Sequence, residues 1–197
     1  MDNNRFFLGV PPTDEVLKQL LEFQRILKKS ALFLRRKDNC RWIEEKNIHL
    51  TLHFLGSLEP SLLSELKSRL LEDLSHYPPH QQSLSEFIAF PRPAYARVAG
   101  VGDRVPTEPL SGMWHHISGI LRSLNVPAED RPFHAHVTLV RLRKPMSFSA
   151  EEVSLFAPKS GLKLVVDRVN LFQSFLAEKG ARYEIVQQFP LAATSMP

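Results

Sequence analysis

A four-residue motif, His-x-Thr-Leu, occurs twice in the chain, at residues 49–52 and at residues 136–139. Each copy lies in a stretch where apolar and polar residues strictly alternate, from 48 to 54 and from 133 to 139. Such alternation predicts a strand with one buried face, because successive side chains of a strand point to opposite sides. The other face of each predicted strand then carries histidine and threonine. One copy would be weak evidence, since a tetrapeptide recurs by chance, but two copies on two such strands indicate a shared site.

The side chains of the two motifs suit acid–base chemistry at a phosphate. Histidine has a pKa near ~6.5, so close to neutral pH one ring can be neutral while another carries a proton. Two such rings can act as general base and general acid when one oxygen attacks phosphorus and another leaves. A threonine hydroxyl two residues along the strand can hydrogen-bond a non-bridging phosphate oxygen. The predicted catalytic residues are therefore His49, Thr51, His136 and Thr138, in a site that needs no metal.

Three further polar residues lie close to the motifs in the sequence. His53 and His134 share the predicted faces of His49 and His136, which makes them candidates for substrate binding. Arg141 is a candidate phosphate contact, although alternation puts it on the face opposite to His136 unless the strand bulges. The four histidines could instead hold a metal ion. That alternative leaves both threonines without a purpose, and the two strands offer no carboxylate ligand.

The rest of the chain is expected to position these two strands. Apolar residues at helical spacing predict helices, and short apolar runs bounded by proline or glycine predict strands. The expected elements, in order, are a strand at 5–10, a helix at about 14–29, the first motif strand to about 56, a helix from 60, strands at 84–90 and 95–101, a helix at about 107–124, the second motif strand, and strands at 162–176 and 181–189. The two motifs lie a little under half the chain apart, so we expect two related lobes that each give one strand to a shared cleft. No linker separates the lobes, and residues 1–197 are expected to form one structural domain.

The segment between the first helix and the first motif strand, residues 30–47, is polar and basic. We expect a loop there. Its cationic side chains, Arg35, Arg36, Lys37 and Arg41, would form either a solvated surface or a contact with a nucleic acid backbone.

The composition is typical of a soluble globular protein, with 43% hydrophobic and 23% charged residues among 197. The formal net charge of +4 and the sequence pI of about 9.3 are compatible with an anionic partner such as a nucleic acid. The apolar runs are too short to span a bilayer, and the N-terminus lacks the pattern of a signal peptide. Cys40 is the only cysteine, so no internal disulfide can form. We expect a cytoplasmic protein without a membrane partner that acts as a monomer.

The surroundings of both motifs carry a resemblance to a known family. Its residues are Asn47–Leu52, Phe54–Gly56 and Arg131–Leu139 at the motifs, and Phe6–Pro11, Ser174-Phe175 and Arg182-Tyr183 near the two ends. Together they resemble the two-histidine phosphoesterase superfamily. Within it the chain is most similar to the bacterial RNA 2′,3′-cyclic phosphodiesterases, also called LigT-like proteins or 2′-5′ RNA ligases. The resemblance covers nearly the whole chain, and the motif pair is its most specific part.

The resemblance implies a bilobal α+β fold, with two pseudo-symmetric lobes of antiparallel sheet and helices around a central cleft. It implies hydrolysis of an RNA 2′,3′-cyclic phosphate to a 2′-phosphate without a metal or other cofactor. By the same resemblance, His49 is the proton donor to the departing 3′-oxygen and His136 is the base that activates water. Thr51 and Thr138 would hold the phosphate. The expected partner is an RNA that ends in a cyclic phosphate, such as a tRNA fragment, or a cyclic-phosphate nucleotide.

Two other functions remain open from the sequence. The first is 2′-5′ joining of tRNA halves, in which an RNA 5′-hydroxyl replaces water in the same acid–base chemistry. The second is a nucleotide- or RNA-binding module that has lost turnover, against which all four motif residues are intact. His53 departs from the apolar or small residue that the resemblance implies at that position. Phe7 and Tyr183 are candidates for stacking on a terminal base, with core packing as the alternative.

Overall fold

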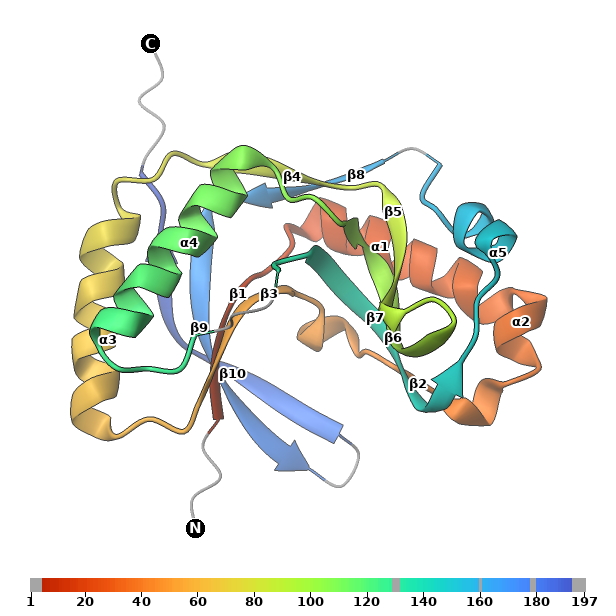
Figure 1. The fold of residues 1–197 in the computed structure, drawn as a ribbon, viewed down its shortest axis with the longest axis horizontal. Helices are drawn as coiled ribbons and strands as arrows, with labels where there is room; N and C mark the ends of the chain where they lie inside the picture. Colours follow the sequence, from red (N-terminus) through yellow and green to blue (C-terminus); the bar gives the residue numbers. More distant parts are fainter. Residues whose placement is uncertain (1–4, 129–131, 160, 178–179, 193–197) are drawn as a thin grey trace.

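The structure is a computed structural model that describes residues 5–128, 132–159, 161–177 and 180–192 (Figure 1). Its strands are β1 (Arg5–Val10), β2 (Cys40–Trp42), β3 (Leu50–Gly56), β4 (His80–Leu84), β5 (Glu86–Arg92), β6 (Tyr95–Asp103), β7 (Ala135–Met146), β8 (Leu162–Val166), β9 (Arg168–Ala177) and β10 (Gly180–Pro190). Its α-helices are α1 (Asp14–Lys29), α2 (Ala31–Leu34), α3 (Pro60–Leu74), α4 (Glu108–Ser123) and α5 (Ala150–Leu155). Two 3-10 turns, η1 (Lys37–Asn39) and η2 (Glu45–Asn47), lie on either side of β2. Within the described ranges no helix is long and apolar enough to cross a membrane.

One antiparallel sheet joins the two motif strands. Its strand order is β10-β9-β1-β3-β7-β6-β5, and β2 pairs with β7 as well. The neighbours β3 and β7 share a single registered pair, Leu50 with Val137, whereas the other neighbours pair along most of their length. The sheet is therefore two groups of strands that meet at one point, β10-β9-β1-β3 on one side and β7-β6-β5 with β2 on the other. A separate two-stranded sheet is formed by β4 and β8.

The helices cross over between the two groups of strands. Helix α1 follows β1 in sequence but lies with α2 and α5 beside the β5-β6-β7 group, and α4 follows β6 but lies with α3 beside the β1-β3-β9-β10 group (Figure 1). The apolar face of α1 includes Val16, Leu20 and Leu27, which are buried. The buried face of α4 includes Leu110, Met113 and Ile117. Each group of strands is thus covered by a helix that follows a strand of the other group in the sequence.

Local sequence signals account for the helix ends. The side chain of Thr13 accepts a hydrogen bond from the backbone N–H of Val16 at 3.4 Å, which caps α1. Asp14 in its first turn and the lysines of its last turn complement the helix dipole. Pro60 begins α3, where its missing N–H costs nothing. The expected starts of α1 and α3 are confirmed.

The α+β class with antiparallel sheet is confirmed, but four details of the expected layout are wrong. The expected loop at 30–47 contains α2, η1, β2 and η2, and β2 joins the main sheet. The expected strand at 84–90 begins only at Glu86, after β4 has ended at Leu84 in the other sheet. The expected strand at 162–176 is divided at Asp167 into β8 and β9, because its two parts pair in different sheets. Helix α5, the fourth difference, was not expected.

The hairpin of β9 and β10 is confirmed, while Glu178 and Lys179 of its expected turn lie outside the described residues.

Candidate active site

The two motifs meet where the two groups of strands meet. His49 directly precedes β3, and His136 is the second residue of β7. Leu50 pairs with Val137 in antiparallel register, so the motifs run past each other in opposite directions. In such a pair the flanking residues face each other in crossed order, which brings His49 next to Thr138 and Thr51 next to His136. All four expected catalytic residues are therefore gathered at one junction of the sheet.

A bulge interrupts the first motif strand immediately after the threonine. Gly9 of β1 pairs with Thr51 but Leu8 pairs with His53, so Leu52 is an extra residue on β3. Leu52 and His53 are consequently buried in succession, at 4% and 1% exposure. The side chain of His53 turns to the face opposite Thr51, where it stacks on Trp114 with ring centroids 4.9 Å apart. The expectation that His53 shares the face of His49 is wrong, because the bulge reverses the alternation.

The second motif strand carries a matching bulge. Gly100 of β6 pairs with Thr138 but Ala99 pairs with Val140, so Leu139 is the extra residue on β7. Leu139 and Val140 are both buried, and the exposed positions resume at Arg141. Arg141 therefore lies on the face of His136 and Thr138, contrary to the strict alternation of the sequence. Arg141 could contact a phosphate at the site only if β7 bulged before it, and this bulge is present.

A side chain from a helix holds each bulge. The carbonyl oxygen of Leu139 accepts a hydrogen bond from Nε2 of Gln24 in α1, at 3.1 Å, and another from the backbone N–H of Ile43. The carbonyl oxygen of Leu52 accepts a hydrogen bond from Nε1 of Trp114 in α4, at 3.0 Å. Gln24 and Trp114 are both buried, where an unpaired polar group is costly. The crossing helices thus fix the backbone directly after both motifs.

The two catalytic candidates are oriented by the same backbone device. Nδ1 of His49 lies 2.8 Å from the carbonyl oxygen of Asn47, and Nδ1 of His136 lies 2.9 Å from that of His134. Because a carbonyl only accepts, Nδ1 carries the hydrogen in both rings, and Nε2 is the nitrogen available for proton transfer. Nε2 of His49 accepts the hydroxyl proton of Thr51 at 3.0 Å. Nε2 of His136 has no hydrogen-bond partner within the described part of the chain.

Burial shifts both rings toward the neutral form. The pKa of His49 is lowered to about 4, chiefly by burial and to a smaller extent by the charges of Arg141 and His136, against the opposing effect of the bond to the Asn47 carbonyl. Burial also lowers the pKa of His136, with smaller contributions in the same direction from His134 and Arg141. A cation disfavours a second cation nearby, so these effects also show that His49, His136 and Arg141 are electrostatic neighbours.

Among the described residues, more aromatic rings lie around His49 than around His136. Phe7, Tyr183 and Phe172 lie 4.8, 5.4 and 5.5 Å from the His49 ring, centroid to centroid. The Phe7 ring also stacks on Phe172 at 4.8 Å and is only 3% exposed, so it supports His49 and offers little surface to a base. Tyr183 is half-buried, edge-on to His49. His136 has one aromatic neighbour among the described residues, Phe90 at 4.6 Å.

Glycine faces the motif backbone on both sides. A Cβ on Gly102 would lie 2.1 Å from the carbonyl oxygen of Ala135 and 2.7 Å from Cα of His136. A Cβ on Gly100 would lie 2.0 Å from the carbonyl oxygen of Val137. On the other side, a Cβ on Gly9 would lie 2.8 Å from the carbonyl oxygen of Leu50 and 3.2 Å from Cδ2 of His49. Neighbouring strands can approach the motifs this closely only because these positions lack a side chain.

The other two histidines are not gathered into a four-nitrogen site. Nε2 of His53 lies 3.2 Å from the carbonyl oxygen of Trp114, behind the sheet. Nδ1 of His134 lies 2.8 Å from the carbonyl oxygen of Arg104, and its ring lies 5.7 Å from Phe90. Among the described residues no group of three or more His, Cys, Asp or Glu is placed to hold a metal ion. The position of His53 contradicts the four-histidine arrangement.

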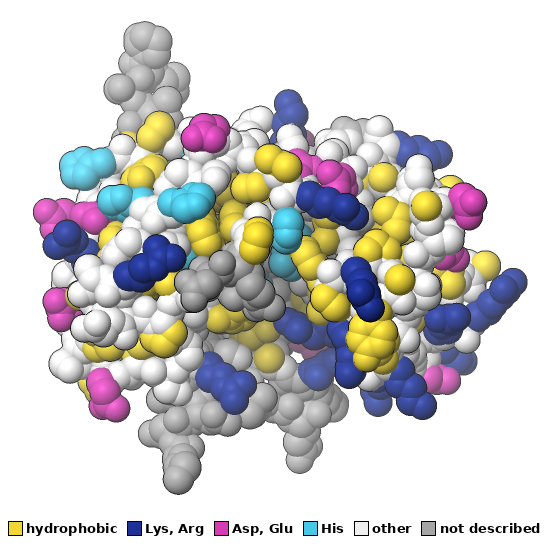
Figure 2. Space-filling model, in the orientation of Figure 1, with side chains coloured by type: hydrophobic (Ala, Val, Ile, Leu, Met, Phe, Trp, Pro, Cys, Tyr) yellow, Lys and Arg dark blue, Asp and Glu magenta, His cyan; other side chains and the backbone are white. Residues whose placement is uncertain are grey.

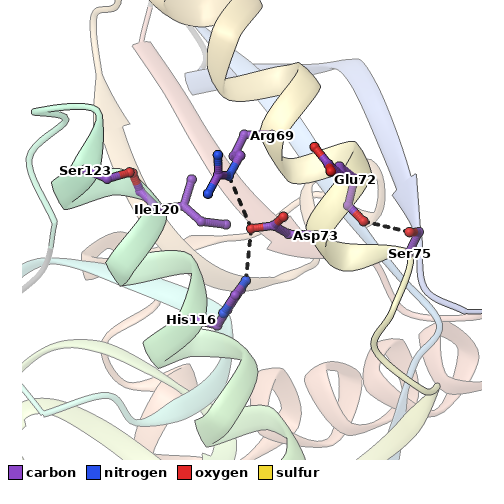
Figure 3. Close-up of polar contacts among 7 residues, drawn as sticks. All are labelled: Arg69, Glu72, Asp73, Ser75, His116, Ile120 and Ser123. Carbon is purple, nitrogen blue, oxygen red and sulfur yellow. Dashed lines mark hydrogen bonds and ion pairs between the residues drawn. The ribbon is translucent and has the colours of Figure 1, made fainter.

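A separate cavity of about 410 Å³ lies between α3 and α4. Its charged groups satisfy one another, since Oδ2 of Asp73 lies 3.1 Å from Nε2 of His116 and 3.5 Å from Nε of Arg69 (Figure 3). Ser75 caps the end of α3 by donating to the carbonyl oxygen of Glu72. None of the motif residues lines this cavity. It is a surface feature of the helix pair, distinct from the strand junction.

Several supporting residues were not predicted from the sequence. Gln24, Phe90, Gly102, Trp114 and Phe172 lie in apolar or helical stretches that give no separate functional signal. One signal did exist: glycines at 100 and 102, two residues apart in a predicted strand, indicate a place where another backbone approaches closely.

Comparison with known proteins finds similarity to phosphoesterases. The family described as "LigT like Phosphoesterase" matches residues 10–99. The chain is 28% identical over 185 residues to an RNA 2′,3′-cyclic phosphodiesterase of Archaeoglobus fulgidus, covering 94% of this chain and 99% of that protein. It is 26% identical over 187 residues to an RNA 2′,3′-cyclic phosphodiesterase of Thermotoga maritima, covering 93% and 94%.

A solved structure shares the fold along nearly the whole length. The crystal structure of E. coli LigT complexed with 3′-AMP matches with a TM-score of 0.78 at 22% identity, covering 98% of this chain and 100% of that one. At this identity the likeness establishes the fold alone.

Proposed function

We propose that the chain is a LigT-like phosphoesterase of the two-histidine superfamily and that it hydrolyses RNA 2′,3′-cyclic phosphates to 2′-phosphates. The observation that carries the proposal is the meeting of β3 and β7 at Leu50 and Val137. It brings together two histidines whose Nδ1 atoms are both tied to backbone carbonyls. Each ring then presents Nε2 for proton transfer, which is what a base and an acid on opposite sides of one phosphorus require.

In the proposed reaction His136 is the base. Nε2 of His136, which has no partner among the described residues, takes a proton from water while the water oxygen bonds to phosphorus. The bond from phosphorus to the 3′-oxygen breaks, and Nε2 of His49 gives that oxygen its proton. The products are a 2′-phosphomonoester and a free 3′-hydroxyl. His49 is left neutral and His136 protonated, and exchange with solvent restores both.

The threonines and Arg141 act on the phosphate itself. The hydroxyl of Thr51 donates to Nε2 of His49 in the absence of substrate and can rotate to a non-bridging oxygen when phosphate arrives. Thr138 lies opposite His49 in the register of Leu50 with Val137, and its hydroxyl is the second donor to the phosphate. Arg141, turned to this face by the bulge, adds a positive charge that stabilises negative charge developing on the phosphate oxygens.

The low pKa of His49 sets a condition on the mechanism. With a pKa of about 4, an empty site at neutral pH holds His49 neutral, although the proposed acid must carry a proton. An anionic phosphate beside the ring favours the charged form and raises the pKa. Binding of the cyclic phosphate is therefore expected to load the proton that His49 then donates.

The proposal extends to the oligomeric state of the protein, its location in the cell and its RNA substrate. Both motifs come from one chain, which supports action as a monomer. The absence of any possible internal disulfide is compatible with a cytoplasmic location. RNA fragments such as tRNA halves carry the required end, and 2′-5′ joining would use the same residues with an RNA 5′-hydroxyl in place of water.

The decisive experiment is an assay on a short RNA that ends in a 2′,3′-cyclic phosphate, in the presence of EDTA, with 2′- and 3′-phosphate products resolved. Clean 2′-phosphate is expected. A 3′-phosphate would show that the substrate lies in the reverse orientation. Tight RNA binding without product would replace the proposal by a binding module, and activity only on addition of a metal would contradict the two-histidine mechanism.

A further inference from the structure

The residue two positions before each motif histidine gives that histidine its backbone partner. The carbonyl oxygen of Asn47 accepts the Nδ1 hydrogen of His49, and that of His134 accepts the Nδ1 hydrogen of His136. Neither carbonyl lies within a strand, since Asn47 ends η2 and His134 directly precedes β7. Strand pairing therefore does not determine where these two carbonyls point, and some other contact must hold them.

The side chains of the same two residues supply that contact. Nδ2 of Asn47 donates a hydrogen bond to the carbonyl oxygen of Ala181 in β10, at 2.9 Å. Nδ1 of His134 lies 2.8 Å from the carbonyl oxygen of Arg104, which directly follows β6, and a carbonyl only accepts. Both donor nitrogens stand two bonds from Cβ, so asparagine and histidine can make the same bond. Each residue thus ties the start of a motif strand to another strand of the same half.

The two acceptor carbonyls are anchored in the sheet. Ala181 pairs within the hairpin of β9 and β10, and it lies two residues from Tyr183, whose ring packs edge-on to the first motif histidine. Arg104 directly follows the pair that Asp103 of β6 forms with Ala135 of β7. A side chain bonded to either carbonyl therefore takes its position from the sheet beside the site.

The amide of Asn47 shows which of its atoms the chain needs. Oδ1 of Asn47 is buried and has no hydrogen-bond partner within the described ranges. A buried polar atom without a partner costs about 1–3 kcal/mol, which an apolar side chain of similar size would avoid. The bond from Nδ2 to Ala181 is therefore the reason for an amide at this position.

We propose that Asn47 and His134 are positioning residues that act on the reaction through His49 and His136. Each side-chain bond holds a backbone carbonyl where it keeps the hydrogen on Nδ1, so that Nε2 is the nitrogen for proton transfer. A neutral ring without such a carbonyl exchanges between two tautomers, and only one of them presents a bare Nε2. His134 then has a role other than the substrate contact expected from the sequence.

The inference rests on the proposed function for its effect on catalysis, whereas its effect on the two rings involves no substrate. The first test therefore reads the ring tautomers by nitrogen NMR in the free protein at neutral pH. Both motif histidines should carry their hydrogen on Nδ1. Asn47→Ala should introduce the Nε2–H tautomer in His49 alone, and His134→Ala should introduce it in His136 alone. Unchanged tautomers in both variants would overturn the proposal, whatever their activity.

Steady-state kinetics on an RNA with a 2′,3′-cyclic phosphate end provide the second test. Asn47→Ala and His134→Ala should each lower kcat by about 10-fold to 10²-fold and change KM by less than about twofold, because a misplaced catalytic group loses rate before binding. A rise in KM at unchanged kcat after His134→Ala would make His134 a substrate contact and overturn its positioning role.

The conservative variant His134→Asn tests the side-chain bond itself. An asparagine there can still donate to the Arg104 carbonyl, as Asn47 donates to the Ala181 carbonyl. It should restore the Nδ1–H tautomer of His136 and most of the kcat that the alanine variant loses. Equal losses in the alanine and asparagine variants would show that the donor is not what matters at this position.

Two control variants remove the same kinds of bond elsewhere. Nδ2 of Asn39 donates to the carbonyl oxygen of Lys144 at 2.9 Å, and Nδ1 of His115 lies 2.8 Å from that of Ser111. Figure 2 shows His side chains gathered over α3 and α4, apart from a further His near the middle of that face, and His115 belongs to α4. Asn39→Ala and His115→Ala should leave both tautomers and kcat unchanged.

Thermal unfolding of every variant separates lost positioning from lost folding. If Asn47→Ala does not fold, Asn47→Ser takes its place, because a serine hydroxyl stands one bond closer to the backbone and falls short of the Ala181 carbonyl. No turnover by the unaltered protein would overturn the proposed function, and the tautomers would still decide this inference. Normal turnover with unchanged tautomers would overturn the inference alone.

Discussion

The first and second motif strands share the same backbone geometry but present different side chains to the site. In both, Nδ1 of the histidine is tied to the carbonyl two residues earlier, at Asn47 or His134. In both, the leucine that ends the motif is the extra residue of a bulge. In both, a buried side chain of a crossing helix binds that leucine's carbonyl. This shared geometry orients both histidine rings in the same way, although the residues after the two motifs differ.

The strands differ in what the bulge then exposes. Three residues after the threonine, the first strand presents Phe54, which is 63% exposed, and the second presents Arg141. Aromatic rings enclose His49 on several sides, whereas His136 has one aromatic neighbour among the described residues and an arginine on its face. The first half thus shelters its histidine, and the second half supplies charge. Because the motifs themselves are alike, these different neighbours are the structural support for the asymmetric roles that we propose for the two histidines.

The largest expected effect comes from removing each ring in turn. His49→Ala and His136→Ala should each lower kcat by about 10²–10⁴, because each removes one partner of an acid–base pair. The double variant should be little worse than the weaker single variant, since the two rings serve one step. Single-turnover rates on a cyclic-phosphate RNA measure this. His115→Ala is the control, because His115 lies exposed on α4 with Nδ1 bonded to the Ser111 carbonyl. Full activity in either motif variant would show that the histidine removed takes no part in the reaction.

The pH dependence of kcat/KM should reveal the shared burial. Both histidine pKa values are lowered in the free protein, so both limbs of the bell-shaped profile move toward acid. The maximum of kcat/KM is therefore expected below pH 6.5. The profile of kcat, which reports the complex with bound phosphate, should have its maximum at higher pH because the anion raises both pKa values. Coincident maxima, or a flat profile across neutral pH, would count against the proposed proton transfers.

Glycine-to-alanine substitutions should show how tightly the backbone packs around each motif. Gly102→Ala forces a methyl group against backbone atoms of Ala135 and His136, which cannot move without shifting β7. Gly9→Ala meets the Leu50 carbonyl at 2.8 Å and the His49 ring edge at 3.2 Å, a less severe overlap. We expect Gly102→Ala to lower stability by about 1–3 kcal/mol and kcat by at least about tenfold. Gly9→Ala should have the smaller effect in both measurements, unfolding midpoint and kcat.

A result in the opposite order would mean that the first motif is the more tightly packed. Gly112→Ala offers a baseline, because Gly112 lies in α4 where an added Cβ meets no atom within 4 Å.

The bulges explain both the successes and the errors of the sequence-based prediction. Alternation within each motif places histidine and threonine on one face, and the structure gathers all four residues at the junction. Alternation fails one residue later, because an extra residue in a strand reverses every position after it. That reversal sends His53 into the core and brings Arg141 to the site. A local sequence pattern does not reveal a bulge whose backbone is hydrogen-bonded by a helix more than sixty residues away, as Leu52 is by Trp114.

The segment at 30–47 was misjudged for a related reason. β2 is three residues long and exists because Cys40, Arg41 and Trp42 pair with β7, a hundred residues later. So short a strand has no periodicity of its own, and its arginine is indistinguishable from a solvated charge in the sequence. Long periodic helices such as α1 were predictable because their signals are local.

The two bulge-holding side chains offer a finer test. Gln24→Leu removes both of the hydrogen bonds that Nε2 donates, to the Leu139 and Ile43 carbonyls, and should lower stability by about 1–3 kcal/mol. It should also raise KM severalfold, because the bulge that presents Arg141 loses its support. Trp114→Phe removes one hydrogen bond, to the Leu52 carbonyl, in the half whose motif strand presents Phe54 where the other presents Arg141. It should lower stability with little change in KM, as chemical denaturation and steady-state kinetics together would show. Equal KM changes would mean that Arg141 does not depend on its bulge.

The smallest expected effect lies outside both motif strands. Asp73 joins His116 and Arg69 across the α3–α4 cavity, where all three side chains are at least partly exposed to water. Exposed ion pairs contribute about 0–1 kcal/mol, so Asp73→Asn should shift the unfolding midpoint only slightly. It should change kcat/KM by less than about twofold, because none of the motif residues lines that cavity. A large loss of activity with unchanged stability would show that the helix pair contributes to catalysis, and the contrast between the two motif strands would then be an incomplete account of the site.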